Sequence, residues 1–360
     1  MNITKKIIRR VRHVAGKMMA KGLYRFIPYS IIQIMVGGKA LIAEDDAIKM
    51  IEEYLPQVNE PELKKILNDM VGSYLRQGAH FYEYLKYGFY RLNERERNDF
   101  VTEGNRYNWY NLVMTKETYE LFKNKWETYQ RFQKYFKRDM ICIKSIDDYG
   151  SFVDFISRHK KYVYKPLDGQ VGRDVKKIVA KENFDIKTRF DSYLTNNCIL
   201  EELIVQNSEM ADLHPASLNT LRISTFLTKD GPVILSALLR MGGNNSFVDN
   251  YSAGGLIAQI DIETGIVFTK GIRGSNREYI YHPDTQKQIV GFNVPAWHDA
   301  IELVKELATV VPEQRYVGWD IAYSDKGWVM VEGNGRGWAI DQITSTKGVY
   351  GLYQKMLEEM

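Results

Sequence analysis

The sequence predicts an α+β protein in which a mainly helical N-terminal region precedes a region of mixed helices and strands. Residues 44–100 space their apolar side chains as helices do, whereas strand-like and helix-like runs alternate from Met140 onward. After Asn219 strand-like runs dominate. A further change of texture lies near residue 206, so we expect three regions, with bounds 1–105, 106–205 and 206–360.

The composition is typical of a folded protein with ample core material. The chain has 360 residues, of which 44% are hydrophobic and 26% charged, and its net charge is only +4. Cys142 and Cys198 form no CxxC motif and lie in apolar runs, so we expect buried thiols in a cytoplasmic protein. No apolar run reaches the ~18 residues of a membrane-spanning helix, and no clear cleavage site follows the basic start, so secretion is not expected.

The N-terminal segment has the pattern of a basic amphipathic helix. Between residues 3 and 19 apolar side chains recur on one face and basic side chains on the other, and no acidic residue precedes Glu44. This pattern suits peripheral contact of residues 1–25 with the anionic inner face of a membrane. The alternative is a helix that packs on its own protein. Nucleic acid is not an expected partner, because the chain contains no base-reading motif.

The helices and strands are predicted in chain order from spacing, turns and caps. Residues 44–58 and 61–77 are expected to be helices, with Gly78 ending the second. Thr115–Arg138 is expected to be one long helix whose aromatic stripe packs in the core. Strands are then expected at residues 140–144, 162–165, 175–180 and 198–205, and helices at 147–159, 183–195 and 296–310.

A β-hairpin near the C-terminal end carries several polar side chains. Residues 317–323 and 328–334 read as strands, and the Ser, Asp and Gly between them supply the turn at 324–327. A three-residue loop would set Ser324 opposite Trp328. The strand alternation then determines which side chains share a face.

In that register two carboxylates face each other, because Asp320 lies opposite Glu332, with Asn334 on the same face. Two charges about 5 Å apart repel by roughly 3 kcal/mol at an effective dielectric constant of about 20. A divalent cation would offset the repulsion, and oxygen ligands without Cys or His suit Mg2+ or Mn2+. The alternative is a hairpin whose carboxylates face water.

A glycine-containing loop follows an apparent strand at Lys165 and includes Gly169 and Gly172. Glycines let backbone N–H groups approach phosphate oxygens, and a lysine at the strand end can neutralise phosphate charge. The loop lacks the GK[ST] of a Walker A motif and precedes a strand rather than a helix. An ordinary glycine-containing hairpin is the alternative.

Other charged residues lie at strand ends or within apolar runs. Glu201 and Glu202 end a strand, where they can either meet an adenine edge or stand as exposed acids at a domain boundary. Arg222 and Arg240 lie in runs expected to be buried, so each needs an anionic partner. His214, beside a proline, is expected to be a loop residue rather than a catalyst.

Five motifs in this order resemble the ATP-grasp superfamily, and in particular its sugar-transfer-associated branch. They are KPLDGQVGRDV, HPASLNTLRI, VDNYSAGG, VGWDIA and VEGNGR, and the resemblance covers about residues 110–355. It implies an ATP-grasp fold, in which two α+β lobes, 106–205 and 206–360, clamp a nucleotide. Residues 1–105 do not resemble the family's usual N-terminal domain, which leaves the substrate open.

The resemblance also implies roles for individual residues. Lys125 and Lys165 would touch phosphates, Gly169 and Gly172 would belong to the lid, and adenine, ribose and loop contacts would involve Glu201, Glu202, Ile204, Asn219 and Asn250. The loop with Asn250, Gly254 and Gly255 resembles that of ribosomal-protein glutamate ligases. Metal ligands would be Asp320, Glu332 and Asn334. The catalytic charges would be Arg222 and Arg240 at the transferred phosphate, and Arg336 at a substrate carboxylate.

The activity implied is that of an ATP-dependent, ADP-forming ligase that joins a carboxylate to an amine through an acyl phosphate, with ATP and Mg2+ (or Mn2+) as cofactors. Small-molecule carboxylates and amines, or a lipid-linked sugar acceptor in cell-surface polysaccharide or envelope assembly, are the expected partners. One alternative is a kinase that phosphorylates a sugar or another alcohol on the same fold. A non-enzymatic, membrane-associated scaffold is the other.

Overall fold

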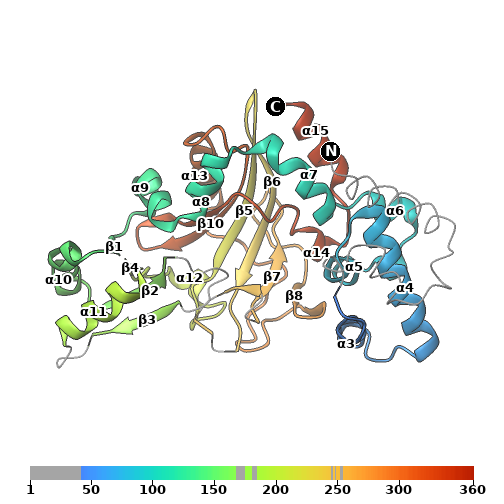
Figure 1. Ribbon diagram of the computed structural model, residues 1–360, viewed down its shortest axis with the longest axis horizontal. Coiled ribbons are helices and arrows are strands. Elements are labelled where there is room, and N and C mark those ends of the chain that lie inside the picture. The colour runs from blue at the N-terminus through green and yellow to red at the C-terminus, as the bar shows by residue number, and fades with distance from the viewer. Residues whose placement is uncertain (1–41, 168–174, 181–184, 245, 248, 252–253) are drawn as a thin grey trace, which may run out of the picture. The chain divides into compact units, whose positions relative to one another are not determined.

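The computed structural model describes residues 42–167, 175–180, 185–244, 246–247, 249–251 and 254–360, and within them it contains helices and two antiparallel sheets (Figure 1). The chain divides into two compact units. One unit is the N-terminal part up to Tyr110 together with residues 346–355, and the other comprises residues 111–345 and 356–360. Each unit is described separately below.

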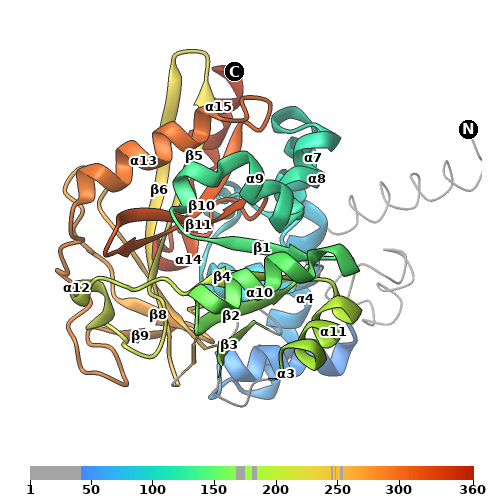
Figure 2. The ribbon, with the colours of Figure 1, turned by 90° about the vertical axis from the view of Figure 1, so that its left-hand side faces the viewer.

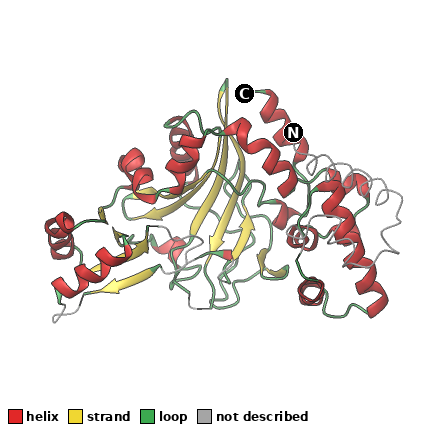
Figure 3. Cartoon of the chain, in the orientation of Figure 1, coloured by secondary structure: helices red, strands yellow, loops and turns green. Residues whose placement is uncertain are grey.

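The regular elements in the described part of the N-terminal unit are helices joined by loops (Figure 3). Its helices are α3 (Glu44–Tyr54), α4 (Glu60–Gln77), α5 (Phe81–Lys86), η2 (Phe89–Arg91), α6 (Glu94–Asn98) and the start of α7 (Glu103–Val113). The predicted end of α4 is confirmed, because Gly78 takes a left-handed conformation (φ 68°) that ends the helix. The helix begins one residue before the predicted Pro61, and the Asn59 side chain caps it by accepting the N–H of Glu62. Trp109 stacks on Tyr353 of α15 (Tyr350–Glu358), which joins the C-terminal segment to this unit.

The second unit begins with two helices where the sequence predicts one. Asn124 is not helical (φ −90°, ψ 105°) and separates α8 (Lys116–Lys123) from α9 (Lys125–Phe136). Its side chain accepts the N–H groups of Trp126 and Glu127, as an N-cap does. The expectation of a single helix is therefore wrong, because an asparagine that can cap a helix interrupts the pattern.

A four-stranded antiparallel sheet follows, with strand order β1-β4-β2-β3. Its strands are β1 (Met140–Ile143), β2 (Lys161–Pro166), β3 (Lys176–Val179) and β4 (Cys198–Glu202). α10 (Tyr149–Arg158) and α11 (Ile186–Asn196) cover one face of this sheet (Figure 2) and bury Phe152, Phe155 and Phe190 against it. The thiol of Cys198 is buried as expected, whereas that of Cys142 is only partly buried.

A seven-stranded antiparallel sheet forms the rest of the unit, with strand order β11-β10-β5-β6-β7-β8-β9. Its strands are β5 (Thr220–Thr228), β6 (Gly231–Met241), β7 (Leu256–Gln259), β8 (Gly271–Arg273), β9 (Arg277–Tyr279), β10 (Tyr316–Ser324) and β11 (Gly327–Asn334). α13 (Trp297–Thr309) packs on one face through Val304 and Leu307. The short helices α12 (Ser208–Ala211) and α14 (Gln342–Ser345) lie in the connections.

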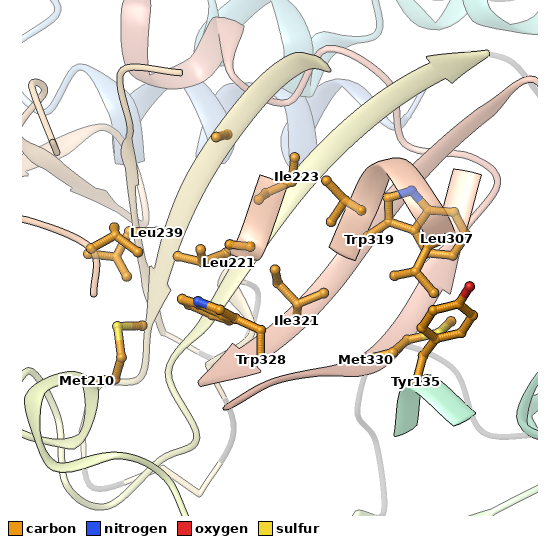
Figure 4. Packing of buried hydrophobic residues seen from close by; sticks show 14 of the residues in the cluster. Tyr135, Met210, Leu221, Ile223, Leu239, Leu307, Trp319, Ile321, Trp328 and Met330 are labelled. Carbon is orange, nitrogen blue, oxygen red and sulfur yellow. The ribbon is translucent and has the colours of Figure 1, made fainter. Parts of the chain in front are cut away.

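Alternation along the central strands separates the core from a polar face. Leu221 and Ile223 of β5 and Trp319 and Ile321 of β10 point into the main hydrophobic core (Figure 4). The residue between each pair therefore points to the opposite face of the sheet, because successive side chains in a strand alternate. Apolar and charged residues thus occupy the same strands one position apart.

The hairpin of β10 and β11 has the predicted opposition but not the predicted turn. Ser324 pairs with Gly327, so the turn has two residues rather than three. A β-bulge at Val331 adds one residue further along, and Asp320 consequently lies opposite Glu332. The opposition of the two carboxylates is confirmed, and its cause is the bulge.

Some predictions concern residues outside the described part of the chain. The N-terminal amphipathic helix falls in residues 1–41, and the lid glycines Gly169 and Gly172 fall in residues 168–174. None of the helices in the described ranges is both long enough and apolar enough to cross a membrane.

Candidate functional site

A cavity of about 830 Å³ lies within the second unit, between the four-stranded sheet and the polar face of the seven-stranded sheet. Strands β2, β3 and β4 contribute one set of lining residues, and β5, β6, β10 and β11 contribute another. The charged residues that line it are Lys123, Lys125, Lys165, Lys177, Arg222, Arg240, Arg336, Glu201, Glu202, Asp249, Asp320 and Glu332. Cationic side chains outnumber acidic ones, which suits an anionic ligand.

Asp320 is the centre of an ion-pair network in this cavity. Strand register sets it directly opposite Arg222, whose Nε and Nη2 both donate to its carboxylate, the second at 2.8 Å. Arg240 adds a third hydrogen bond, from Nη1 to Asp320 Oδ2 at 2.7 Å. Burial alone would raise the pKa of Asp320, but the two guanidinium groups outweigh it and lower the pKa to about 2. The carboxylate is therefore ionised at neutral pH.

Arg240 has further partners in the loop that follows β6. Its Nη2 donates to Asn250 Oδ1 at 2.6 Å and lies 3.3 Å from Asp249 Oδ1. Asp249 also accepts a hydrogen bond from the Thr220 hydroxyl, and burial raises its pKa despite the nearby arginine. The expectation that each buried arginine has an anionic partner is confirmed for both Arg222 and Arg240.

Glu332 differs from Asp320 because its side chain has no hydrogen bond or ion pair with any described residue. Its side chain reaches solvent, yet it stands in a cleft surrounded by protein, and burial followed by the charge of Asp320 raises its pKa. Asn334 lies on the same face of β11. It donates its amide N–H to the Gly318 carbonyl at 3.4 Å, which leaves its Oδ1 available as a ligand.

These oxygens fit a hard divalent cation only in part. No cluster of three His, Cys, Asp or Glu side chains that could hold a metal exists in the described ranges. Glu332 and Asn334 supply uncommitted carboxylate and amide oxygens, the donors that Mg2+ and Mn2+ take. Asp320 is already shared by two arginines, which supply the positive charge that the sequence alone assigned to a metal ion. Asp320 can become a third ligand of the cation only if Arg222 and Arg240 leave it to contact a bound anion.

The opposite wall presents a lysine that is fixed by a buried glutamate. Lys165 Nζ lies 2.7 Å from Glu201 Oε1, and the Glu201 side chain is only 6% exposed. Burial would raise the pKa of Glu201, but Lys165 and Arg138 outweigh it and lower the pKa. Arg138, which donates to Glu201 Oε2 from Nη2 at 3.0 Å, is not among the residues predicted from the sequence.

The end of β4 continues along the cavity wall through Glu202 and Ile204. The Glu202 carboxylate accepts the backbone N–H of Asp139 and the Nζ of Lys326, each at 3.0 Å. Neither glutamate is a simple exposed acid, so that alternative is wrong for both. Both carboxylates therefore have protein partners.

Asn219 does not line the cavity, which corrects its expected contact with a ribose. It is fully buried, and its amide nitrogen donates to the carbonyls of Met210 and His214, at 2.8 and 3.1 Å. Its Oδ1 accepts the Ser217 hydroxyl at 3.1 Å. His214 lies in a loop, as predicted, and its buried ring contacts the Ser217 hydroxyl.

One end of the cavity combines cations with an aromatic ring. Lys125 at the start of α9 and Arg336 after β11 both line it. The guanidinium of Arg336 lies 4.0 Å from the centre of the Tyr119 ring, a cation–π contact. Tyr119 is the first residue of the aromatic stripe that the sequence assigned to the core. The later members Phe132 and Phe136 are in the core, as predicted.

The loop that carries Asn250 depends on a glycine at its end. A Cβ at Gly255 would stand 2.4 Å from the carbonyl oxygen of Asp249, so no larger residue fits there. The neighbouring Gly254 has φ 89°, which also favours glycine. These two glycines let the loop close tightly beside Arg240.

A family model described as sugar-transfer associated ATP-grasp matches residues 105–357. No curated protein sequence matches the chain.

The solved structures to which the chain is similar include one ligase and two synthetases. The ATP-grasp ligase PsnB, complexed with precursor peptide PsnA2 and AMPPNP, shares 12% identity over 71% of this chain and 66% of its own, with a TM-score of 0.42. The ADP complex of purK, an N5-carboxyaminoimidazole ribonucleotide synthetase, shares 12% identity over 62% and 47%, with a TM-score of 0.38. N5-carboxyaminoimidazole synthetase from Staphylococcus aureus, complexed with ADP, shares 10% identity over 63% and 48%, with a TM-score of 0.39. The chain thus spans less than two thirds of the length of each.

Proposed function

The chain belongs to the sugar-transfer associated ATP-grasp family and has its α+β fold, and on this premise we propose that it is an ATP-dependent carboxylate–amine ligase. In this proposal residues 106–205 and 206–360 are the two lobes that hold the nucleotide. ATP is bound with Mg2+ or Mn2+, and ADP and phosphate leave. The amide is formed through an acyl phosphate.

The observation that carries the proposal is the meeting of four cations and two uncommitted oxygen ligands in one cavity. Lys165 enters from the four-stranded sheet, while Arg222 and Arg240 enter from the seven-stranded sheet. Glu332 stands beside them without an ion-pair partner among the described residues, and Asn334 keeps its amide oxygen uncommitted. Lys125 is the fourth cation, at the start of α9. A polyphosphate with its bound cation satisfies both sets of groups.

In the proposed reaction the substrate carboxylate attacks the γ-phosphorus of ATP, and the bond between this phosphorus and ADP breaks. Arg222 and Arg240 stabilise the negative charge on the transferred group, and a bound divalent cation lowers the charge of the phosphates when present. The amine then attacks the acyl carbon, loses a proton and expels phosphate. No protein nucleophile takes part, and Glu332 with Asn334 would hold the cation.

The substrates are proposed from the family description and the site. The association with sugar transfer supports an acceptor in cell-surface polysaccharide or envelope assembly, including a lipid-linked amino sugar. Arg336, set on the Tyr119 ring, supports recognition of a substrate carboxylate. Contact of residues 1–25 with the inner face of a membrane would bring such an acceptor close, and this segment lies outside the described residues.

Product analysis tests the proposal. The full-length protein is incubated with ATP, Mg2+, candidate carboxylates and hydroxylamine, which replaces the natural amine. We expect ADP and phosphate in equal amounts and a hydroxamate that depends on the carboxylate. Release of AMP and pyrophosphate would falsify an acyl-phosphate route. A stable phosphorylated sugar without hydroxamate would show the kinase activity instead.

A further inference from the structure

Arg138 is a buried cation between α9 and β1, to which the proposed function assigns no role. Its side chain is 3% exposed. Three of its nitrogens are used: Nε and Nη2 donate to Glu201 Oε2, at 3.3 and 3.0 Å, and Nη1 donates to the carbonyl of Met330 at 2.6 Å. Such a group stays buried only where its hydrogen bonds are satisfied.

These contacts join the two sheets that flank the cavity. Glu201 belongs to β4 of the four-stranded sheet, and Met330 belongs to β11, the edge strand of the seven-stranded sheet. Met330 directly precedes Val331, the bulge residue that sets Glu332 opposite Asp320. One guanidinium is therefore attached both to the glutamate that contacts Lys165 and to the strand that presents Glu332.

The charges of Arg138, Glu201 and Lys165 together set the net charge at this wall of the cavity. Glu201 is shared by two cations, Arg138 behind it and Lys165 in front of it. Two positive charges and one negative charge leave one net positive charge; Lys165 and Glu201 both line the cavity, whereas Arg138 does not. Without Arg138 the remaining pair would be neutral, and Glu201 would draw Lys165 back with its full charge.

We propose that Arg138 is a positioning residue that acts through Glu201, keeping the Lys165 ammonium placed and electrostatically uncompensated for a nucleotide phosphate. The inference builds on the proposed function only in that the cavity takes ATP. Arg138 itself does not touch the ligand. The contact with Met330 fixes the guanidinium relative to β11, so Lys165 and Glu332 are positioned from a common group.

A double-mutant cycle on nucleotide binding tests the proposal. Equilibrium titrations with AMPPNP and Mg2+ compare the full-length protein with Arg138→Met, Glu201→Gln and the double variant, and adenosine replaces AMPPNP in a parallel series. We expect Arg138→Met to weaken AMPPNP about tenfold and adenosine less than threefold. In the Glu201→Gln background the same substitution should change AMPPNP affinity less than threefold, because the compensating carboxylate is gone.

A matched control comes from the same lobe. Arg158 is 47% exposed and pairs with Asp139 and Asp154 outside the cavity, so Arg158→Met should leave both affinities unchanged. Melting temperatures of all variants identify any that do not fold. Should Arg138→Met fail to fold, Arg138→Lys is measured both in the protein that keeps Glu201 and in the Glu201→Gln variant. We expect Arg138→Lys to weaken AMPPNP binding only where Glu201 is present.

The outcomes separate this inference from the proposed function. Equal tenfold losses in both backgrounds, equal losses for adenosine and AMPPNP, or no loss at all would each overturn the role of Arg138. A wild-type protein that binds no AMPPNP would overturn ATP binding and this inference together. AMP rather than ADP in the product assay would refute the acyl-phosphate chemistry, but it would not affect the inference about Arg138, which is tested by nucleotide binding alone.

Discussion

Two nearly isosteric substitutions on one hairpin are expected to change stability in opposite directions. Asp320→Asn removes the charge that Arg222 and Arg240 share. Glu332→Gln removes a charge that no described residue pairs with, and whose pKa is raised by burial and by Asp320. Because the two carboxylates face each other in register, the variants test which of them the surrounding charges stabilise.

The loss of stability caused by Asp320→Asn depends on which other partners Arg222 and Arg240 keep. Arg240 keeps Asp249 and Asn250, whereas Arg222 has no other anionic partner among the described residues. Removing one member of a buried ion pair typically costs about 3–5 kcal/mol, and the partial compensation of Arg240 favours the lower value. At roughly 2–4 °C for each kcal/mol in a unit of this size, the melting temperature should fall by about 6–12 °C.

The gain from Glu332→Gln is smaller because water reaches this side chain. A raised pKa means that folding favours the protonated carboxyl, so its charge lowers stability once the pH rises above the value of the unfolded chain. Screening by water in the open cleft limits this gain in stability to about 1 kcal/mol or less, which is a rise in melting temperature of at most roughly 2–4 °C. The gain should vanish below about pH 4, where the carboxyl is protonated in both states.

Thermal unfolding in EDTA at pH 7.5, followed by circular dichroism, measures both effects without a bound cation. Wild type, Asp320→Asn, Glu332→Gln and the double variant are compared at one protein concentration. Equal melting temperatures for wild type and Asp320→Asn would show that the arginines do not depend on Asp320. A clear loss of stability in Glu332→Gln would show that Glu332 has a stabilising partner and is not an uncommitted ligand.

Three further predictions concern other parts of the chain. Lys165→Ala should weaken AMPPNP binding at least tenfold in a nucleotide titration, or about 1.4 kcal/mol, and unchanged affinity would reduce its loop to an ordinary hairpin. Burial raises the pKa of Asp341 to about 6, so stability falls as the pH rises from about 4 to about 6 and stays lower above that. Asp341→Asn should therefore gain about 1–3 kcal/mol at pH 7.5 in denaturant unfolding but nothing below about pH 4. Deletion of residues 1–25 should abolish sedimentation with anionic vesicles at low salt while leaving nucleotide binding intact, and vesicle binding that persists would place the contact elsewhere.

Strand alternation made part of the site predictable from the sequence. Once residues 317–323 and 328–334 are read as paired strands, Asp320, Glu332 and Asn334 must share a face. The turn was predicted with one residue too many, and the opposition survived only because the bulge at Val331 supplies that residue elsewhere. A bulge leaves little trace in local residue preferences, so its position emerges only from the pairing.

Partners distant in sequence were beyond prediction. Arg222 and Asp320 are 98 positions apart, so a buried arginine indicates that an anion exists but not which one. The expected contact of Asn219 with a ribose is wrong because a polar residue within a family motif is easily taken for a ligand contact. Its amide instead donates to two backbone carbonyls and so stabilises the surrounding loop. Arg138 was missed since a cation where a helix ends looks like a solvated cap until β4 and β11 are placed around it.

The wide spacing of the paired charges has a consequence for how the protein reaches its active form. The contacts of Asp320 with Arg222 and Arg240 close chain loops of 98 and 80 residues, which makes them late and slow events in folding. Until the central strands are paired, the three charges are far apart and hydrated, and no fragment that lacks β5, β6 or β10 can bring them together. Nucleotide added during refolding should therefore bind only at the end, and resistance to proteolysis conferred by nucleotide would report that the whole sheet has closed.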